Sequence, residues 1–437
     1  MIVQEQKPVE TVAPPAKKAT WWPLAVLVAI NVLNFYDRHV AGAVVEPVRK
    51  EFSLSDTQIG WLNTVFTVLY GIVGLPLGQL ADRVSRKKLL AAGITVWALF
   101  TASSRWIQSY AFLVVARLGV GVGEATAAPT ATSWIGDLYP PERRSRPLAL
   151  FMLGVPVGGA LSFFFSGLIA QKLGGWRSAM LAAAVPALIL VPLLLLLDEP
   201  ARGAAERRVK VDSGSIWEVL RIPAFWWIVI SGALVNFNLY AIGTFLPAFF
   251  ARIHHMDLAK AGFATGTVYA IGGICGGTLA GVWGDRIVHR SRSGRMAIAA
   301  AAALLAAPFA YFGIHQGFGQ SLLAVSLLTI AYGLLNMYYG LVYASIQDIV
   351  PPALRGTSMA IYFLVMYLLG ASWGSVVIGS LSDRFARHAA ALAGAAKVTE
   401  AFKAIGLQQA LLAIPVLSVA LAAVLWAGSR SMAKVKS

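Results

Sequence analysis

Charged residues are scarce in this chain. Only 13% of its 437 residues are Asp, Glu, Lys or Arg, whereas a soluble domain has about 25%. Hydrophobic residues make up 58% of the sequence, and the mean hydropathy is +0.69. This composition excludes an ordinary soluble domain and indicates a membrane protein with many spans.

Other features are also absent, and each absence excludes a class. There is one cysteine, Cys275, so no intrachain disulfide can form. The sequence contains no P-loop, which disfavours primary ATP-driven transport. Alternation of the barrel type is missing, so the apolar segments are expected to be helices. Residues 1–20 are polar and Pro-rich rather than a cleavable signal peptide, and we expect the first apolar segment to act as an uncleaved anchor.

Twelve apolar stretches of roughly 20 residues are each long enough to cross a membrane as a helix. The predicted fold is an all-α membrane protein with twelve transmembrane helices in two pseudo-symmetric six-helix bundles. The stretches cover residues 22–46, 57–81, 88–106, 110–137, 146–171, 176–197, 223–251, 260–284, 296–315, 319–349, 357–382 and 406–428.

The longest polar break follows the sixth stretch and divides the chain into halves. We predict a disordered cytoplasmic tail, an N-terminal bundle, a cytoplasmic linker, a C-terminal bundle and a second cytoplasmic tail, at residues 1–20, 21–197, 198–222, 223–428 and 429–437. Most of the 36 Lys and Arg residues fall in the tails and in the loops on the same side as them, so we expect both termini to be cytoplasmic. The net charge of +16 is therefore attributed to topology and contact with anionic lipid, not to nucleic acid.

The two halves repeat each other. GQLADR (78–83) recurs as GVWGDR (281–286), and PERR (141–144) recurs as PALR (352–355). Two matched pairs at corresponding places predict a parallel internal repeat, in which the halves are related by an axis along the membrane normal.

The loop GQLADRVSRKK (78–88) resembles the signature loop of the major facilitator superfamily. That resemblance implies alternating access, in which two halves rock around a central cavity, and a gating role for the loop on the cytoplasmic side. The second copy has His289 where the first has Arg86. The gate residues predicted in this way are Gly78, Asp82, Arg83, Arg86, Asp285 and Arg286.

Four ionisable residues lie inside apolar segments: Asp37 and Arg38 in the first, Arg117 and Glu124 in the fourth. A charge at bilayer depth costs about 2.5–3.5 kcal/mol on insertion scales, so it persists only when it is paired or faces water. Burial and a neighbouring guanidinium act on the pKa of a carboxylate in opposite directions, which suits a proton carrier. We predict a proton-coupling network of these four residues. A purely structural ion network is the alternative.

Two stretches around these residues carry a closer resemblance. NFYDRHVAG (34–42) and RLGVGVGEATAAPTATSWIGDLYPPERRSR (117–146) resemble the Spinster family of lysolipid and sphingolipid transporters. Organic anion–cation symporters share a similar first helix and a glutamate in the fourth. The sequence after Glu124 is the stretch that favours Spinster.

The second half carries uncharged polar and aromatic residues instead. Helical spacing places Asn236 and Tyr240 on one stripe of the seventh span, and Asn336, Tyr339 and Tyr343 on one stripe of the tenth. In the resembling superfamily, spans 1, 4, 7 and 10 line the cavity. We therefore predict substrate contacts from these five residues, together with Asn31 and Asn34 of the first span. Interfacial anchoring is the alternative for the tyrosines.

These features together predict a proton-coupled secondary transporter of an amphipathic lipid, such as a lysophospholipid or a sphingoid derivative. We expect it to be a monomer in a bacterial inner membrane, without cofactor or metal. The outward loop His254–Asp257 is interpreted as solvated rather than as a metal site. The alternatives are an organic-anion symporter, another small-molecule efflux carrier, or a receptor that does not transport. An enzyme would need a catalytic cluster that the sequence lacks.

Overall fold

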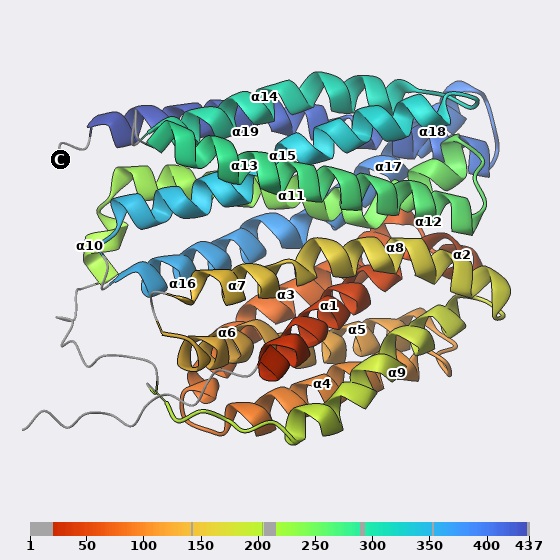
Figure 1. Cartoon of the computed structure of the whole chain (residues 1–437). Helices are drawn as coiled ribbons and strands as arrows, with labels where there is room; N and C mark the ends of the chain where they lie inside the picture. The colour runs from red at the N-terminus through yellow and green to blue at the C-terminus, as the bar shows by residue number, and fades with distance from the viewer. Residues whose placement is uncertain are drawn as a thin grey trace, which may run out of the picture.

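The computed structural model describes residues 21–140, 143–202, 204, 216–288, 293–351 and 354–434. The predicted tail 1–20, residues 203 and 205–215 of the linker, His289, and parts of the PERR and PALR repeats lie outside these residues. The described residues form helices and no strands. Twelve rods built from these helices stand side by side in two groups of six, which confirms the predicted fold class (Figure 1).

The N-terminal half contains six rods, and a short helix, α2 (Val45–Glu51), follows the first of them. The rods are α1 (Trp21–Ala43), α3 (Asp56–Ala81), α4 (Arg86–Ser103), α5 (Tyr110–Glu124) with α6 (Ala127–Leu138), α7 (Ser145–Met152) with α8 (Gly154–Lys172), and α9 (Trp176–Leu195).

The C-terminal half begins after the short helix α10 (Ile216–Leu220), and two of its rods contain a turn of π-helix, η2 and η4. Its rods are α11 (Pro223–Ile253), α12 (Leu258–Thr267) with η2 (Val268–Gly272) and α13 (Gly273–Val288), α14 (Gly294–His315), α15 (Ser321–Ile349), α16 (Arg355–Val365) with η4 (Met366–Ala371) and α17 (Ser372–Leu392), and α18 (Glu400–Leu411) with α19 (Ala413–Lys434).

Ten of the twelve rods are long and apolar enough to cross a membrane. The other two, α1 and α4, have 23 and 18 residues. Buried polar residues interrupt the apolar sequence of α1, and α4 opens with Arg86 and two lysines. At about 1.5 Å per residue, α1 is long enough to span about 30 Å of hydrocarbon, whereas α4 falls slightly short of that length.

Local sequence sets where several helices begin. The Ser55 hydroxyl caps α3 by accepting a hydrogen bond from the backbone amide of Gln58. The side-chain oxygen of Gln58 accepts one from the backbone amide of Ser55, which completes a capping box. Ser85 caps α4, and Asp257 caps α12. These caps fix the points at which the chain re-enters the bundle.

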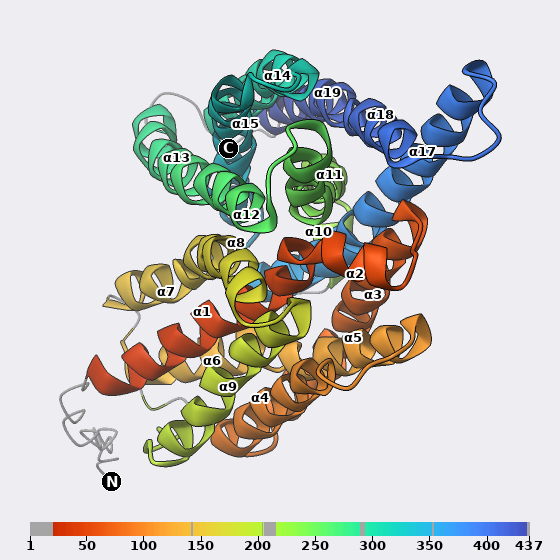
Figure 2. The same ribbon diagram turned by 90° about the vertical axis from the view of Figure 1, so that its right-hand side faces the viewer.

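The two halves meet through α1, α3 and α8 on one side and α11, α12 and α17 on the other (Figure 2). We call the end of the bundle near Trp21 and Lys434 the termini side, and the opposite end the far side. One buried apolar core runs through the C-terminal half and into the far side of the N-terminal half. A second core, which includes Leu24, Leu90 and Leu194, belongs to the N-terminal half alone and lies toward the termini side. The halves are therefore packed together on the far side.

Glycines allow this close packing on the far side. A Cβ built on Gly60 would lie 2.5 Å from the backbone oxygen of Ser375, and one on Gly379 would lie 2.2 Å from the backbone oxygen of Asp56. The same holds where α1 crosses α11, because a Cβ on Gly42 would lie 2.5 Å from the backbone oxygen of Gly243. Only glycine permits the backbones to approach this closely.

Candidate functional site

A buried ion pair joins the first and fourth spans at the centre of the N-terminal half. Nη2 and Nε of Arg38 donate to Oε2 of Glu124 at 3.0 and 3.1 Å, and Nη2 also reaches Oδ1 of Asn34 at 3.5 Å. Glu124 is completely buried and Arg38 is 6% exposed. The pair brings together two of the four charged residues that the sequence predicts as one network.

The other two charged residues lie beside this pair without bonding directly to each other. Asp37 turns toward α4, where its Oδ2 accepts a hydrogen bond from the Thr101 hydroxyl at 2.8 Å. Arg117 lies with its guanidinium 4.7 Å from the centre of the Phe66 ring. Among the described residues, Nε and Nη2 of Arg117, Oδ1 of Asp37 and Oε1 of Glu124 have no hydrogen-bond partner. The site therefore holds two carboxylates and two guanidiniums, with unused donors and acceptors on three of them.

Tyrosines surround the other side of Arg38. Its guanidinium carbon lies 4.5 Å from the ring centre of Tyr70 on α3. Tyr70 packs against Tyr367 of η4 at 5.1 Å between ring centres, and Tyr367 packs against Tyr240 of α11 at 6.4 Å. All three tyrosines are close enough to interact electrostatically with Arg38. Arg38 is thus in contact with a carboxylate and a tyrosine of its own half, and two tyrosines of the other half act on it electrostatically.

The predicted residues of the second half form a polar and aromatic wall, and direct contacts link three of them. The Tyr339 hydroxyl donates to Oδ1 of Asn236 at 2.9 Å, and Tyr339 packs against Tyr343 with ring centres 5.5 Å apart. Tyr240, Asn336, Tyr339 and Tyr343 are all partly exposed although they lie inside the bundle. This wall lies opposite the ion pair, across the seam between the halves.

The two predicted asparagines of the first span have different surroundings. Nδ2 of Asn31 donates to the backbone oxygen of Phe151 at 2.6 Å, so this amide holds α1 against α7. Asn34 touches Arg38, and its own Nδ2 has no partner among the described residues. Asn34 therefore belongs to the central site, whereas Asn31 lies apart from it.

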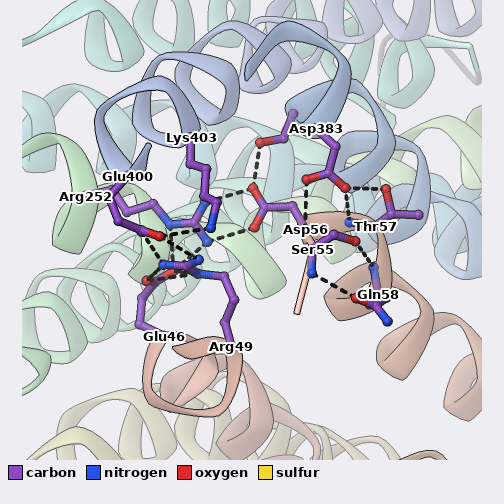
Figure 3. Close-up of polar contacts among 11 residues, drawn as sticks. Glu46, Arg49, Ser55, Asp56, Thr57, Gln58, Arg252, Asp383, Glu400 and Lys403 are labelled. Carbon is purple, nitrogen blue, oxygen red and sulfur yellow. Dashed lines mark hydrogen bonds and ion pairs between the residues drawn. The ribbon is translucent and has the colours of Figure 1, made fainter. Parts of the chain in front are cut away.

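A network of charged residues closes the far side, and the sequence did not predict it (Figure 3). Arg252 of α11 donates to both carboxylate oxygens of Asp56 at 2.8 Å and to Glu46 at 2.7 Å. Arg49 of α2 pairs with Glu400 of α18 at 2.5 Å. Each arginine thus bonds to carboxylates of the opposite half, so the network fastens the two halves to each other.

Asp383 of α17 adds a further link, because it accepts hydrogen bonds from the backbone amides of Asp56 and Thr57 at 3.1 and 2.9 Å. Closer to the centre, Nδ2 of Asn63 donates to the hydroxyls of Thr244 and Ser375 at 2.7 and 3.0 Å. Two polar layers and a layer of glycines therefore seal the far side.

Known proteins are similar to this chain in sequence and in fold. The family model described as Major Facilitator Superfamily matches residues 27–375. An MFS-type efflux pump of Mycolicibacterium smegmatis is 30% identical over 369 residues, which cover 84% of this chain and 85% of the pump. Protein spinster homolog 1 of Bos taurus is 30% identical over 387 residues, which cover 83% of this chain and 73% of that protein.

A solved structure of a bacterial homologue of the human lysosomal transporter Spinster, inward-facing and unoccupied, superposes with a TM-score of 0.86 at 25% identity. The superposition covers 95% of this chain and 98% of that one. This chain is a Spinster-family member of the major facilitator superfamily. A D-xylose–proton symporter, with a TM-score of 0.72 at 17% identity, shares the fold alone.

The signature loop of this transporter is held within the N-terminal half. Arg86 is buried and forms ion pairs with Asp137 and with Glu199, the latter at 3.2 Å. Burial raises the pKa of Glu199, but hydrogen bonds from the Ser85 hydroxyl and from the Arg86 and Lys87 amides outweigh it and lower the pKa to about 2. The segment after α9 thus fastens the start of α4.

The remaining predicted gate residues make no bond across the halves within the described chain. Asp82 and Arg83 are exposed, and the neighbour nearest to a Cβ on Gly78 is Pro129 of the same half, at 3.8 Å. Asp285 and Arg286 of the second copy are exposed too. The predicted gating role of these five residues therefore stays a prediction, and the described halves are joined on the far side.

In the second copy of the signature loop, Arg295 makes the described ion pairs, whereas His289 is the residue that aligns with Arg86 in sequence. Arg295 at the start of α14 lies 2.6 Å from Asp348 and 4.0 Å from Asp285. The contact with Asp348, at the end of the tenth span, corresponds to that of Arg86 with Asp137, at the end of the fourth. Arg295 therefore corresponds to Arg86 in this contact, and His289 lies outside the described residues. The loop between α13 and α14 is longer than its counterpart, and this shifts the matching residue along the sequence.

Proposed function

We propose that this transporter is a proton-coupled secondary carrier of an amphipathic lipid, such as a lysophospholipid or a sphingoid derivative. It works by alternating access as a monomer in a bacterial inner membrane, with both termini in the cytoplasm. With that orientation the far side is external, and the arrangement with a sealed far side is the inward-facing one. The observation that carries the proposal is the buried Arg38–Glu124 pair beside Asp37, which faces a wall of tyrosines across the seam.

The proton-coupling part of the proposal rests on the unequal partners of the two carboxylates. Glu124 shares a charge-assisted hydrogen bond with Arg38, whereas Asp37 accepts from the neutral Thr101 hydroxyl. A buried carboxylate without a bonded cation is costly in its charged form. Uptake of a proton at Asp37 therefore removes a buried charge without breaking an ion pair, and we assign proton binding to it first.

The lipid part rests on the wall in the second half and on the Spinster resemblance. A lipid needs apolar walls for its chain and a few polar groups for its head. Asn236, Asn336, Tyr240, Tyr339 and Tyr343 provide such groups on an aromatic surface, and Asn34 offers a free amide on the opposite half. We assign head-group contacts to these six residues. Asn31 is left out because it holds α1 against α7, apart from the central site.

The proton role is tested in proteoliposomes with an imposed pH gradient. Asp37→Asn is expected to abolish the pH dependence of lipid flux while the protein stays folded. Thr101→Val serves as a matched control, because it removes the hydrogen bond to Asp37 and keeps the carboxylate. Unchanged pH dependence in folded Asp37→Asn protein would count against Asp37 as the proton site.

The cargo is tested by a chain-length series. For a lipid, affinity should rise with acyl length by up to about 0.8 kcal/mol per buried methylene. Tyr343→Ala should weaken binding of long chains more than that of short ones.

The unpartnered nitrogens of Arg117 favour one alternative, a small organic anion bound directly by this guanidinium. If affinity does not change with chain length but is lost in Arg117→Ala protein, the cargo is a small organic anion and not a lipid. An absence of flux for either class would favour a receptor.

A further inference from the structure

The C-terminal half touches the charge network of the N-terminal half through a turn of π-helix. Residues Met366–Ala371 form η4, between α16 and α17. The π-helix is rare, appears mostly as a single widened turn inside an α-helix, and is frequent at functional sites. Tyr367 lies in this turn and packs on Tyr70 of α3 and on Tyr240 of α11.

The widened turn is fixed in place from behind. A Cβ on Gly370 would lie 2.3 Å from the Ala233 oxygen, so the backbone of η4 lies directly against α11. Because η4 packs against both α3 and α11, it lies at the seam between the halves. This fixed backbone places Tyr367 beside Arg38.

Arg38 is consequently shared between the halves. In its own half it bonds to Glu124 at 3.0 Å. From the other half, Tyr240 and Tyr367 lie within its electrostatic reach. Tyrosine oxygens attract a guanidinium, and this attraction is stronger where no carboxylate competes for the same donors. The other charged or titratable groups that act on the pair are Asp37, Arg117 and Tyr70.

We infer that Tyr240 and Tyr367 are positioning residues through which the C-terminal half responds to the charge on Glu124. When Glu124 is neutral, Arg38 loses its carboxylate partner. Asn34 and Tyr70 remain beside it in its own half, and the attraction of the two tyrosines of the other half then makes up a larger share of its polar interactions. That attraction acts between the two halves, so neutralising Glu124 favours the arrangement in which the far side is closed. This inference rests on the proposed function, because it takes Glu124 to change protonation during the transport cycle.

The test measures the balance of far-side-closed and far-side-open molecules by pulsed electron paramagnetic resonance. Spin labels are placed at Gln108 and Lys397, which are exposed on far-side loops of the two halves, after Cys275→Ser. Glu124→Gln stands in for the protonated side chain. In the parent background this substitution should shift the balance toward the closed form by at least about fivefold, the lower end of ordinary coupling between sites.

The same shift is then measured in Tyr240→Phe/Tyr367→Phe protein, which keeps both rings and loses both hydroxyls. It should fall below about twofold there, on the same scale of coupling. Tyr338→Phe is the matched control. The Tyr338 hydroxyl bonds to Ser231 and Tyr362 inside the C-terminal half, so its loss should leave the shift intact.

A shift that survives undiminished in the double variant would overturn the inference and leave the proposed transport unaffected. A shift that is lost equally in Tyr338→Phe would also overturn it, because the effect would then not depend on Arg38. No shift in the parent background would overturn the inference and would count against Glu124 as a proton site as well. Lipid flux, measured separately, decides the proposed function on its own terms.

Discussion

Gly379→Ala should open the far side of the transporter. The added Cβ would lie 2.2 Å from the Asp56 oxygen, 2.6 Å from the Asp56 carbonyl carbon and 3.0 Å from the Thr57 nitrogen. All three are backbone atoms at the start of α3, so no side chain can rotate away. To restore an ordinary contact of 3.4 Å, α3 and α17 must separate by roughly 1 Å. Overpacking of this kind costs about 1–3 kcal/mol, which is about 5- to 150-fold in the balance of the two forms.

This cost falls only on the form in which the far side is closed, because the contact joins the two halves. The assay is the distance between spin labels at Gln108 and Lys397, with the longer distance expected to gain population in Gly379→Ala protein. Gly317→Ala is the matched control, since a Cβ at Gly317 meets nothing within 4 Å. If folded Gly379→Ala protein shows the same distances as the parent, the glycine contact does not hold the far side closed.

Three further expectations concern other parts of the molecule. Removing Glu124 and Arg38 together should cost less thermal stability than the sum of the single removals, with an interaction of about 0.5–3 kcal/mol, and strict additivity would show that the pair is not coupled. Asp82→Ala should raise the cytoplasmic accessibility of a thiol placed in the cavity, and accessibility equal to the parent would refute the gating role of this loop. Because the pKa of Glu199 is lowered to about 2 from 4.5, its stabilising effect is complete above pH 4.5 and is lost as the pH falls toward 2. The melting temperature of Glu199→Gln protein should therefore fall less over that interval than the melting temperature of the parent, and identical slopes would exclude this contribution.

The sequence was sufficient to predict the fold class and the presence of four charged residues within the spans, for physical reasons that the structure makes clear. Hydrophobic runs of spanning length leave few other architectures. A charged residue inside such a run needs a partner. The sequence offered two carboxylates and two guanidiniums, and only the structure shows that Arg38 pairs with Glu124. Asp37 and Arg38 are adjacent in α1, so their side chains point in different directions, and Asp37 bonds to Thr101 on another helix.

The residues that sequence reasoning missed follow a pattern too. Asp56 and Arg252 lie at the ends of spans, where a charge usually meets water and lipid heads, so nothing in their sequence indicates a buried pair. Arg295 was missed because extra residues in its loop disturb the alignment of the repeat. Tyr367 was missed because it lies in the eleventh span, whereas the predicted cavity residues were taken only from spans 1, 4, 7 and 10.

The first turn of α3 depends on the other half of the molecule. Its leading amides, on Asp56 and Thr57, donate to the carboxylate of Asp383, which belongs to α17. Helix ends need partners for these amides, and water is the substitute when a side chain withdraws. Separation of the halves therefore changes the hydrogen-bond partners of the first turn of α3 as well as its position. Hydrogen exchange at these two amides should thus follow each opening of the transporter, without any label or substrate.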